Sequence, residues 1–196
     1  GIVDPARFNP WQGYMDRFDG IHIAAFRCDD ADAAYGELQD RADCFDAPVD
    51  RRREAPFGNG TRTMKFRNIF SQDEFYPEGR FIVIEHQTPE ILWRNALMVH
   101  PNGAIGLEAM VLVADDDGAT RDRMQAVAGV AAIDDRIGLP GGGIIDILDP
   151  ARFAARFPGV TPPRLPWIGG CVVSVEDLAA ARRLIAGNGV KLNDSA

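Results

Sequence analysis

Apolar and polar positions recur in the same order three times along the chain. An apolar run of strand length comes first, an acidic pair closes it, and a stretch with helical spacing follows. The apolar runs are residues 20–28, 106–114 and 170–175. Aspartate at such a boundary can cap the first turn of a helix. The pattern predicts helices over residues 30–41, 117–128 and 177–186, because the aspartates Asp116 and Asp177 follow Asp30 at offsets of 86 and 147 residues.

Three further runs after the first helix predict the rest of one unit. Residues 48–56 are extended and rich in arginine, residues 60–70 alternate after a Gly-Asn-Gly turn, and residues 80–87 contain a β-prone Phe-Ile-Val-Ile run. One unit is therefore a strand, a helix and three strands, or βαβββ. The second unit is shorter, with strands at residues 136–139 and 143–148. The third has a strand and a helix only.

Glycines between the two short strands of the second unit predict a tight turn. Pro140 is followed by three glycines that precede a strand. A phosphate-binding loop would instead open a helix with its free N–H groups, so this stretch is interpreted as a hairpin turn. When Pro89 is aligned with Pro150, Glu85 lies over Asp146.

A five-residue repeat marks the boundary between units. The sequence Asp-Pro-Ala-Arg-Phe occupies residues 4–8 and returns unchanged at residues 149–153. Such self-similarity indicates a supersecondary unit used more than once. We therefore expect residues 1–3 to be the tail of a last strand, and the chain to lack its first unit. The predicted fold class is α+β, with repeated βαβββ units that form curved mixed sheets.

Composition narrows the range of partners. The chain has 196 residues, of which 46% are hydrophobic, so it is long enough to bury the cores of two small domains. Its net charge of −8 argues against nucleic acid or an anionic membrane surface as a partner, because both are bound through clustered Lys and Arg. No apolar stretch approaches the roughly 20 residues of a membrane span. Neither nucleic acid nor a membrane is therefore expected as the main partner.

Basic residues and cysteines add two points. Arg51, Arg52 and Arg53 form the only basic run; they could hold an anionic substrate or form a solvated strand. Cys28, Cys44 and Cys171 match no zinc or redox spacing, and thiols in apolar strands behave as small hydrophobes. A reducing cytoplasm fits them best.

Several short motifs resemble one known family. They are Pro-Glu-Gly-Arg-Phe at residues 77–81, Glu-His at 85–86, Thr-Pro-Glu at 88–90, Trp93, and His-Pro-Asn-Gly-Ala at 100–104. Together with the βαβββ repeat they resemble bacterial glyoxalase-like domain proteins of the vicinal oxygen chelate superfamily. The resemblance implies two glyoxalase-like domains, residues 1–103 and 104–196. His100 lies in a turn sequence, so it is interpreted as a linker residue.

The resemblance also implies a metal site. The superfamily holds a divalent ion with a histidine near the start of a first strand and a glutamate on a last strand, and the matching positions here are His22 and Glu85. Both residue types suit Zn, Fe, Mn or Ni. Glu85 could also move a proton in catalysis. Partner ligands would lie upstream of Gly1, so the chain holds half a site, and the second unit offers only Glu108 and Asp146, which points to a structural half.

Strand geometry leaves alternatives open for these residues. A histidine in an apolar strand is often hydrogen-bonded in the core or at an edge, which is the other interpretation of His22. Glu85 and His86 are adjacent, so they point to opposite faces of a sheet. If the face shared by Phe81 and Glu85 lines the cavity, Glu85 is a ligand and His86 packs elsewhere.

Two functions from different classes follow. One is a metal-dependent lyase, isomerase or dioxygenase, in which an ion binds two neighbouring substrate oxygens as a Lewis acid. The other is a metal-free binding module of the bleomycin-resistance type, with a cavity lined by Trp11, Phe81 and Trp93. An open sheet edge would need a cover, so we also expect a homodimer.

Overall fold

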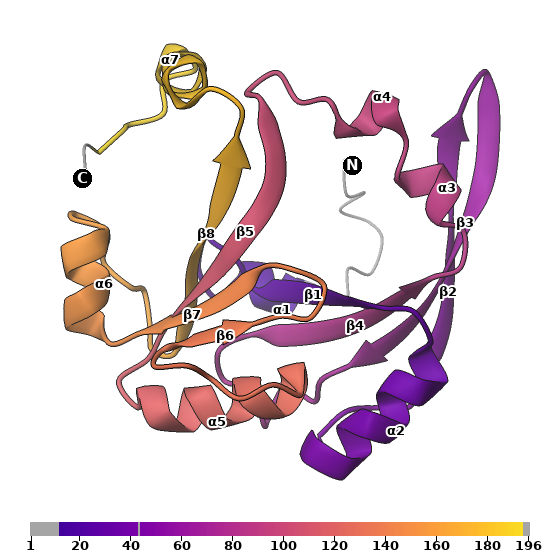
Figure 1. The fold of residues 1–196 in the computed structure, drawn as a ribbon, viewed down its shortest axis with the longest axis horizontal. Coiled ribbons are helices and arrows are strands. Elements are labelled where there is room, and N and C mark those ends of the chain that lie inside the picture. The colour runs from indigo at the N-terminus through magenta and orange to yellow at the C-terminus, as the bar shows by residue number, and fades with distance from the viewer. Residues whose placement is uncertain (1–11, 43, 194–196) are drawn as a thin grey trace.

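The described part of the chain forms two four-stranded mixed sheets (Figure 1). The structure is a computed structural model, and it describes residues 12–42 and 44–193. In the first sheet the order is β1 (Ile23–Cys28), β4 (Arg80–His86), β3 (Gly60–Phe70) and β2 (Val49–Phe57). In the second it is β6 (Arg136–Gly138), β7 (Ile144–Leu148), β5 (Ala104–Val113) and β8 (Trp167–Val175). The α+β class with βαβββ units is confirmed.

The three long helices follow the predicted capping aspartates. They are α2 (Ala31–Ala42), α5 (Asp117–Ala128) and α7 (Leu178–Gly187). The side chains of Asp116 and Asp177 each accept a hydrogen bond from the backbone N–H three residues on, and Asp30 does the same for α2. Each predicted boundary lies within one residue of the observed one, because these caps are local. Four short helices complete the element order: α1 (Gln12–Met15), α3 (Pro89–Leu92), α4 (Asn95–Met98) and α6 (Pro150–Arg156).

The first sheet contains one complete unit. β1 pairs in parallel with β4, and β4, β3 and β2 pair antiparallel in turn. The second sheet repeats this arrangement with β5 parallel to β7, but β6 has only three residues. β8 pairs antiparallel with β5, so the first strands of two successive units lie side by side (Figure 1). The three glycines after Pro140 form the predicted turn, which is closed by a bond from Gly142 N to Leu139 O.

Pairing in the two sheets corrects the alignment of the second unit. Ile23 pairs with Arg80, and Ala109, which lies 86 residues after Ile23, pairs with Ile144. Asp146 therefore corresponds to Ile82 and not to Glu85. The alignment on Pro89 and Pro150 was wrong by three residues, because the second unit reaches its proline sooner after the start of its last strand.

The same register confirms that His22 and Glu108 are equivalent. Gly79 faces the backbone carbonyl of His22, and a Cβ on it would meet that oxygen at 2.7 Å. Gly143, with a φ of 90°, approaches the carbonyl of Glu108 in the same way. At the first position only glycine leaves room for the neighbouring strand.

One hydrophobic core spans the two sheets. It contains Leu38 and Phe81 from the first half together with Met124 and Ile145 from the second. Ile21, just before β1, also forms an isolated bridge with Ile168 in β8. A second, smaller cluster lies under α6 around Phe153 and Trp167. The expected strand at residues 1–3 lies outside the described residues.

Candidate ligand site on the first sheet

Helix α2 packs against one face of the first sheet and not against the opposite face. Leu38 of α2 packs with Phe26, Phe81 and Val83, so these strand residues lie on the helix face. We call the opposite side the far face. Because directly paired residues share a face, the far face consists of Ile23, Ala25, Arg27, Val49, Arg51, Arg53, Ala55, Phe57, Arg62, Met64, Phe66, Asn68, Phe70, Arg80, Ile82, Ile84 and His86.

Strand alternation separates the charges of the first sheet. Every acidic residue in its four strands lies on the helix face, and these are Asp50, Glu54 and Glu85. Every charged side chain that the strands place on the far face is an arginine: Arg27, Arg51, Arg53, Arg62 and Arg80. The far face is therefore positive in a chain whose net charge is −8.

Aromatic rings occupy the middle of the far face. Phe66 and His86 are paired across β3 and β4, with ring centroids 5.3 Å apart at an edge-on angle. The Trp93 ring lies 5.9 Å from the same histidine, although Trp93 remains 49% exposed. Edge-to-face packing is a favoured arrangement of aromatic rings, so these contacts hold the three rings together as one apolar cluster.

Arginine side chains stack on aromatic rings at both ends of this cluster. The guanidinium carbons of Arg62 and Arg94 lie 4.2 and 4.8 Å from the ring centre of Phe57. At the other end Arg51 and Arg80 lie 5.8 and 5.4 Å from the ring centre of Phe70. Stacking orders a guanidinium and leaves its N–H groups able to donate in the plane.

At one end of the far face an acidic residue neutralises part of the positive charge. Asp73 accepts a hydrogen bond from the Tyr14 hydroxyl and lies 3.1 Å from Arg80 Nε. Burial, and then the hydrogen bond to Asp73, raises the pKa of Tyr14 to about 12. Tyr14 is therefore a neutral donor at physiological pH.

His86 carries no positive charge at neutral pH. Burial lowers its pKa from the ordinary value, and the nearby charge of Arg27 lowers it further. The imidazole consequently adds to the aromatic surface, and the arginines alone supply the charge.

Asn68 carries an unsatisfied buried oxygen on this face. Its side-chain oxygen is buried and has no hydrogen-bond partner within residues 12–42 and 44–193. It pairs with Ile84 and Val49, which places it between the arginines of β2 and the apolar residues of β4. An unmade hydrogen bond of this kind costs about 1–3 kcal/mol.

His22 stands just before β1 and contacts the segment that leads into it. Its Nε2 lies 2.8 Å from the carbonyl oxygen of Phe18, and its ring packs 4.1 Å from the ring of Phe18. The ring of Tyr14 lies 6.2 Å away. These contacts match the hydrogen-bonded interpretation of this histidine.

Glu85 lies at the other end of the same strand pair. Its Oε2 accepts a hydrogen bond of 3.0 Å from the backbone N–H of Ala31, the first residue of α2. Glu85 pairs with Cys28, whereas His22 precedes Ile23, so the two side chains are separated by about 20 Å of strand at roughly 3.3 Å per residue. The structure does not bring His22 and Glu85 to one cavity, and the face of Glu85 is the helix face.

This placement does not fit the metal site that the resemblance implied. One ion needs its ligand atoms at roughly 2.0–2.2 Å, far less than the separation of these two side chains. Among the described residues, no group of three or more His, Cys, Asp and Glu side chains could hold a metal ion.

The expected aromatic residues divide between the two faces. Trp93 lies on the far face against His86. Phe81 is fully buried beneath α2 and has no access to a ligand. Trp11 lies outside the described residues. Arg51 and Arg53 belong to the basic run that the sequence showed, but their shared face was not predicted, although strand alternation was the available signal.

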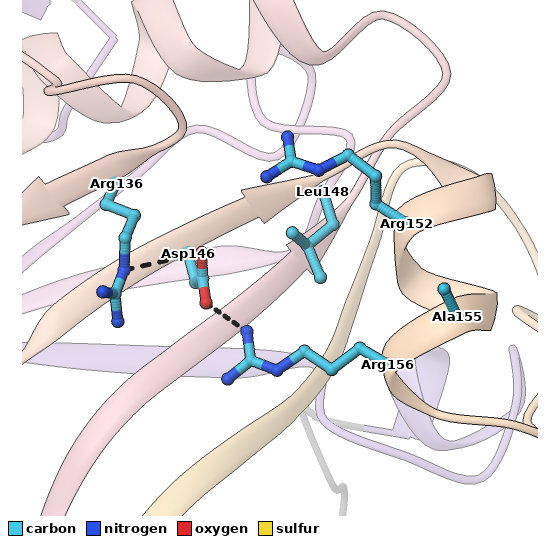
Figure 2. A pocket seen from close by; sticks show the side chains of 6 residues that line it. All are labelled: Arg136, Asp146, Leu148, Arg152, Ala155 and Arg156. Atoms are coloured by element: carbon cyan, nitrogen blue, oxygen red, sulfur yellow. Dashed lines mark hydrogen bonds and ion pairs between the residues drawn. The ribbon is translucent and has the colours of Figure 1, made fainter. Parts of the chain in front are cut away.

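On the corresponding face of the second sheet, α6 lines a pocket together with residues of β6 and β7 (Figure 2). Asp146, with 6% of its side chain exposed, pairs with Arg156 of α6 and lies 3.8 Å from Arg136 on the paired strand. Leu148, on the same face, packs with Phe153 of α6. Asp146 is therefore a paired structural carboxylate. Glu108, the counterpart of His22, accepts a 2.7 Å hydrogen bond from Ser174.

Sequence comparison identifies the family to which this chain belongs. A family model described as "Glyoxalase-like domain" matches residues 3–128. The chain belongs to this family, which is of the vicinal oxygen chelate type, and the resemblance in its motifs is confirmed.

Solved structures are similar only at a distance. A hypothetical protein from Staphylococcus aureus has 13% sequence identity and a TM-score of 0.46, over 64% of this chain and 51% of that one. Lactoylglutathione lyase from Agrobacterium tumefaciens has 14% identity and a TM-score of 0.32, over 69% of this chain and 96% of the lyase. The chain thus spans about half the length of the staphylococcal protein. No curated protein matches it.

Proposed function

We propose that this glyoxalase-like protein binds a small organic molecule on the far face of its first sheet. The observation that carries the proposal is the aromatic cluster of Phe66, His86 and Trp93, which lies beside ordered arginines and the unpaired oxygen of Asn68. A ligand with a flat ring would cover the exposed part of the Trp93 ring.

A binding module of the bleomycin-resistance type agrees best with the positions of the side chains. Lewis-acid chemistry by this unit would need His22 and Glu85 on one ion, and they lie at opposite ends of β1 and β4. Glu85 is also occupied at the start of α2. No catalytic role is therefore proposed for it.

The proposal is tested by titrating the chain with 2-naphthamide, a flat neutral ring, in a calorimeter. Replacing Trp93 by Ala should weaken binding about fivefold, the loss of one aromatic contact of roughly 1 kcal/mol. The control is Ile133→Ala, which removes an 80% exposed side chain in the second half of the chain. Equal affinities for the Trp93 variant and the unmodified chain would contradict the proposed site.

We also propose a homodimer that forms through the open edge of β1. Within the described residues β1 pairs with β4 on one side only, and a groove of about 1010 Å³ runs along its other edge between residues 23–29 and β5. The equivalent edge of β5 is covered by an antiparallel first strand, β8. The first strand of a second copy would cover β1 in the same way.

We also propose a division into two domains and a cytoplasmic location. The division into residues 1–103 and 104–196 agrees with one sheet in each part, although the main core draws on both. The three cysteines are free thiols, which is compatible with the proposed cytoplasmic location. No helix of the described residues is long and apolar enough to cross a bilayer.

A further inference from the structure

We infer that the ligand of the far face is a small aromatic carboxylate, whose ring packs on Phe66 and Trp93 and whose acid group binds Arg51 and Arg53. The inference rests on the proposed function and adds the chemical class of the ligand. Its basis is the charge of this face together with the spacing of the arginines from the rings.

Charge complementarity favours an anion. Among the described residues, Arg51, Arg53, Arg62 and Arg94 take part in no ion pair, although the chain has 29 acidic residues against 21 basic ones. Four guanidinium groups on one face repel one another unless an anion lies between them. Arginine also binds carboxylate through two parallel hydrogen bonds, which a neutral ligand cannot provide.

The spacing of side chains fits one ligand. Arg51 is paired with Phe66 across β2 and β3, and Arg53 is paired with Met64, the next far-face residue along β3. Paired side chains lie about 5 Å apart at Cβ, and far-face neighbours along a strand about 6.6 Å apart. A ring on Phe66 therefore places an attached carboxylate between Arg51 and Arg53, while the Phe70 ring orients Arg51.

The second sheet differs from the first because its arginines have acidic partners. Its arginines at the corresponding face are already matched, since Arg156 and Arg136 flank Asp146 (Figure 2). Arg152 pairs with Asp135. Helix α6 lies over that face. The unmatched arginines on the described part of the first sheet are therefore a feature of one unit and not of the repeat.

Position 52 offers a matched control within the same strand. Arg52 lies between the two ligand arginines in sequence, but it pairs with Lys65 on the helix face. A substitution at this position changes the net charge by the same amount as one at Arg51 or Arg53. It leaves the far face unchanged.

The experiment compares 2-naphthoate with 2-naphthamide, which has the same ring without the charge, on the full chain by titration calorimetry. We expect 2-naphthoate to bind at least tenfold more tightly than 2-naphthamide. Arg51→Gln and Arg53→Gln should each weaken 2-naphthoate about tenfold, which is the usual value of a charge-assisted hydrogen bond. Arg52→Gln should leave its affinity unchanged, and 2-naphthamide should not distinguish these three variants.

Salt provides a test that needs no variant. Raising the salt concentration from 0.05 to 0.5 M should weaken 2-naphthoate severalfold and leave 2-naphthamide unchanged. Equal affinities for the two probes, with Trp93→Ala still weakening both, would overturn the carboxylate assignment and retain the binding site. If neither probe responds to Trp93→Ala, the proposed function fails as well.

Discussion

The two residues predicted as metal ligands make different contacts at the residue scale. Glu85 accepts a hydrogen bond from the first N–H of α2, where a carboxylate is also favoured by the helix dipole. His22 is held against the carbonyl oxygen and ring of Phe18. The sequence predicted the strands that carry both residues. It did not predict which face each would occupy, because that depends on the side from which α2 packs.

Glu85 should contribute to stability. Replacing it by Gln keeps the shape but removes the charge at the start of α2, so the free energy of unfolding should fall by about 0.5–1 kcal/mol in urea titrations. Binding of 2-naphthoate should be unchanged, because Glu85 lies on the helix face. A loss of ligand affinity with no change in stability would contradict this role.

His86 should titrate below the ordinary histidine value. Burial and the charge of Arg27 both lower its pKa, so the stability that depends on neutral His86 is present above the unfolded value of about 6.5 and is lost as pH falls through the folded pKa. An NMR titration of the ring protons checks the direction. Arg27→Gln should raise this pKa, and bound 2-naphthoate should raise it too. A ring that titrates above 6.5 in the free protein would contradict the account.

At the scale of elements, local signals were predictable and non-local ones were not. The helices α2, α5 and α7 followed from aspartates within one turn of their start. The equivalence of Ile82 and Asp146 could not be read from the sequence, because it depends on how distant strands pair. The paired residues Ile23 and Arg80 are 57 positions apart in the first unit, whereas Ala109 and Ile144 are 35 apart in the second. The unmatched charge of the far face depends on the same pairing.

The edge of β1 gives a prediction about assembly. The hydrogen bond from Arg80 N to His22 O shows that the backbone groups of even-numbered residues in β1 point toward β4. The N–H of Ala25 therefore faces the open edge. Ala25→Pro should remove a donor from the dimer interface without breaking the sheet, and light scattering should show a monomer.

A matched proline next to that position separates assembly from folding. Ala24→Pro should break the ladder to β4 and destabilise the protein, because the N–H of Ala24 points toward Arg80 O. A dimer that persists in Ala25→Pro, or an unmodified chain that is monomeric, would contradict the proposed interface.

At the scale of the molecule, a buried polar contact joins the two halves. Glu78, with its side chain fully buried, accepts hydrogen bonds from Thr120 at 2.8 Å and from Arg123 Nε at 2.9 Å, both on α5. Arg41 of α2 adds a 3.2 Å bond to the carbonyl oxygen of Ala126. The two sheets are therefore attached through α5 as well as through the shared core.

Removing the Glu78 carboxylate should weaken this attachment. Glu78→Ala should lower the free energy of unfolding by about 3 kcal/mol, because Arg123 and Thr120 lose their buried partner. Glu74→Ala, at an exposed position nearby in the chain, is the control and should change it by less than about 0.5 kcal/mol. Similar losses for the two variants in urea titrations would contradict a specific role for Glu78.

The central claim is that the far face of the first sheet binds the ligand, and the indole N–H signals of the tryptophans test it most directly. Trp93 lies on the far face and is 49% exposed, whereas Trp167 is 8% exposed in the second sheet. When 2-naphthoate is added to nitrogen-15-labelled protein, the Trp93 signal should shift progressively and saturate, and the Trp167 signal should stay in place. A shift at Trp167 with none at Trp93 would contradict the account.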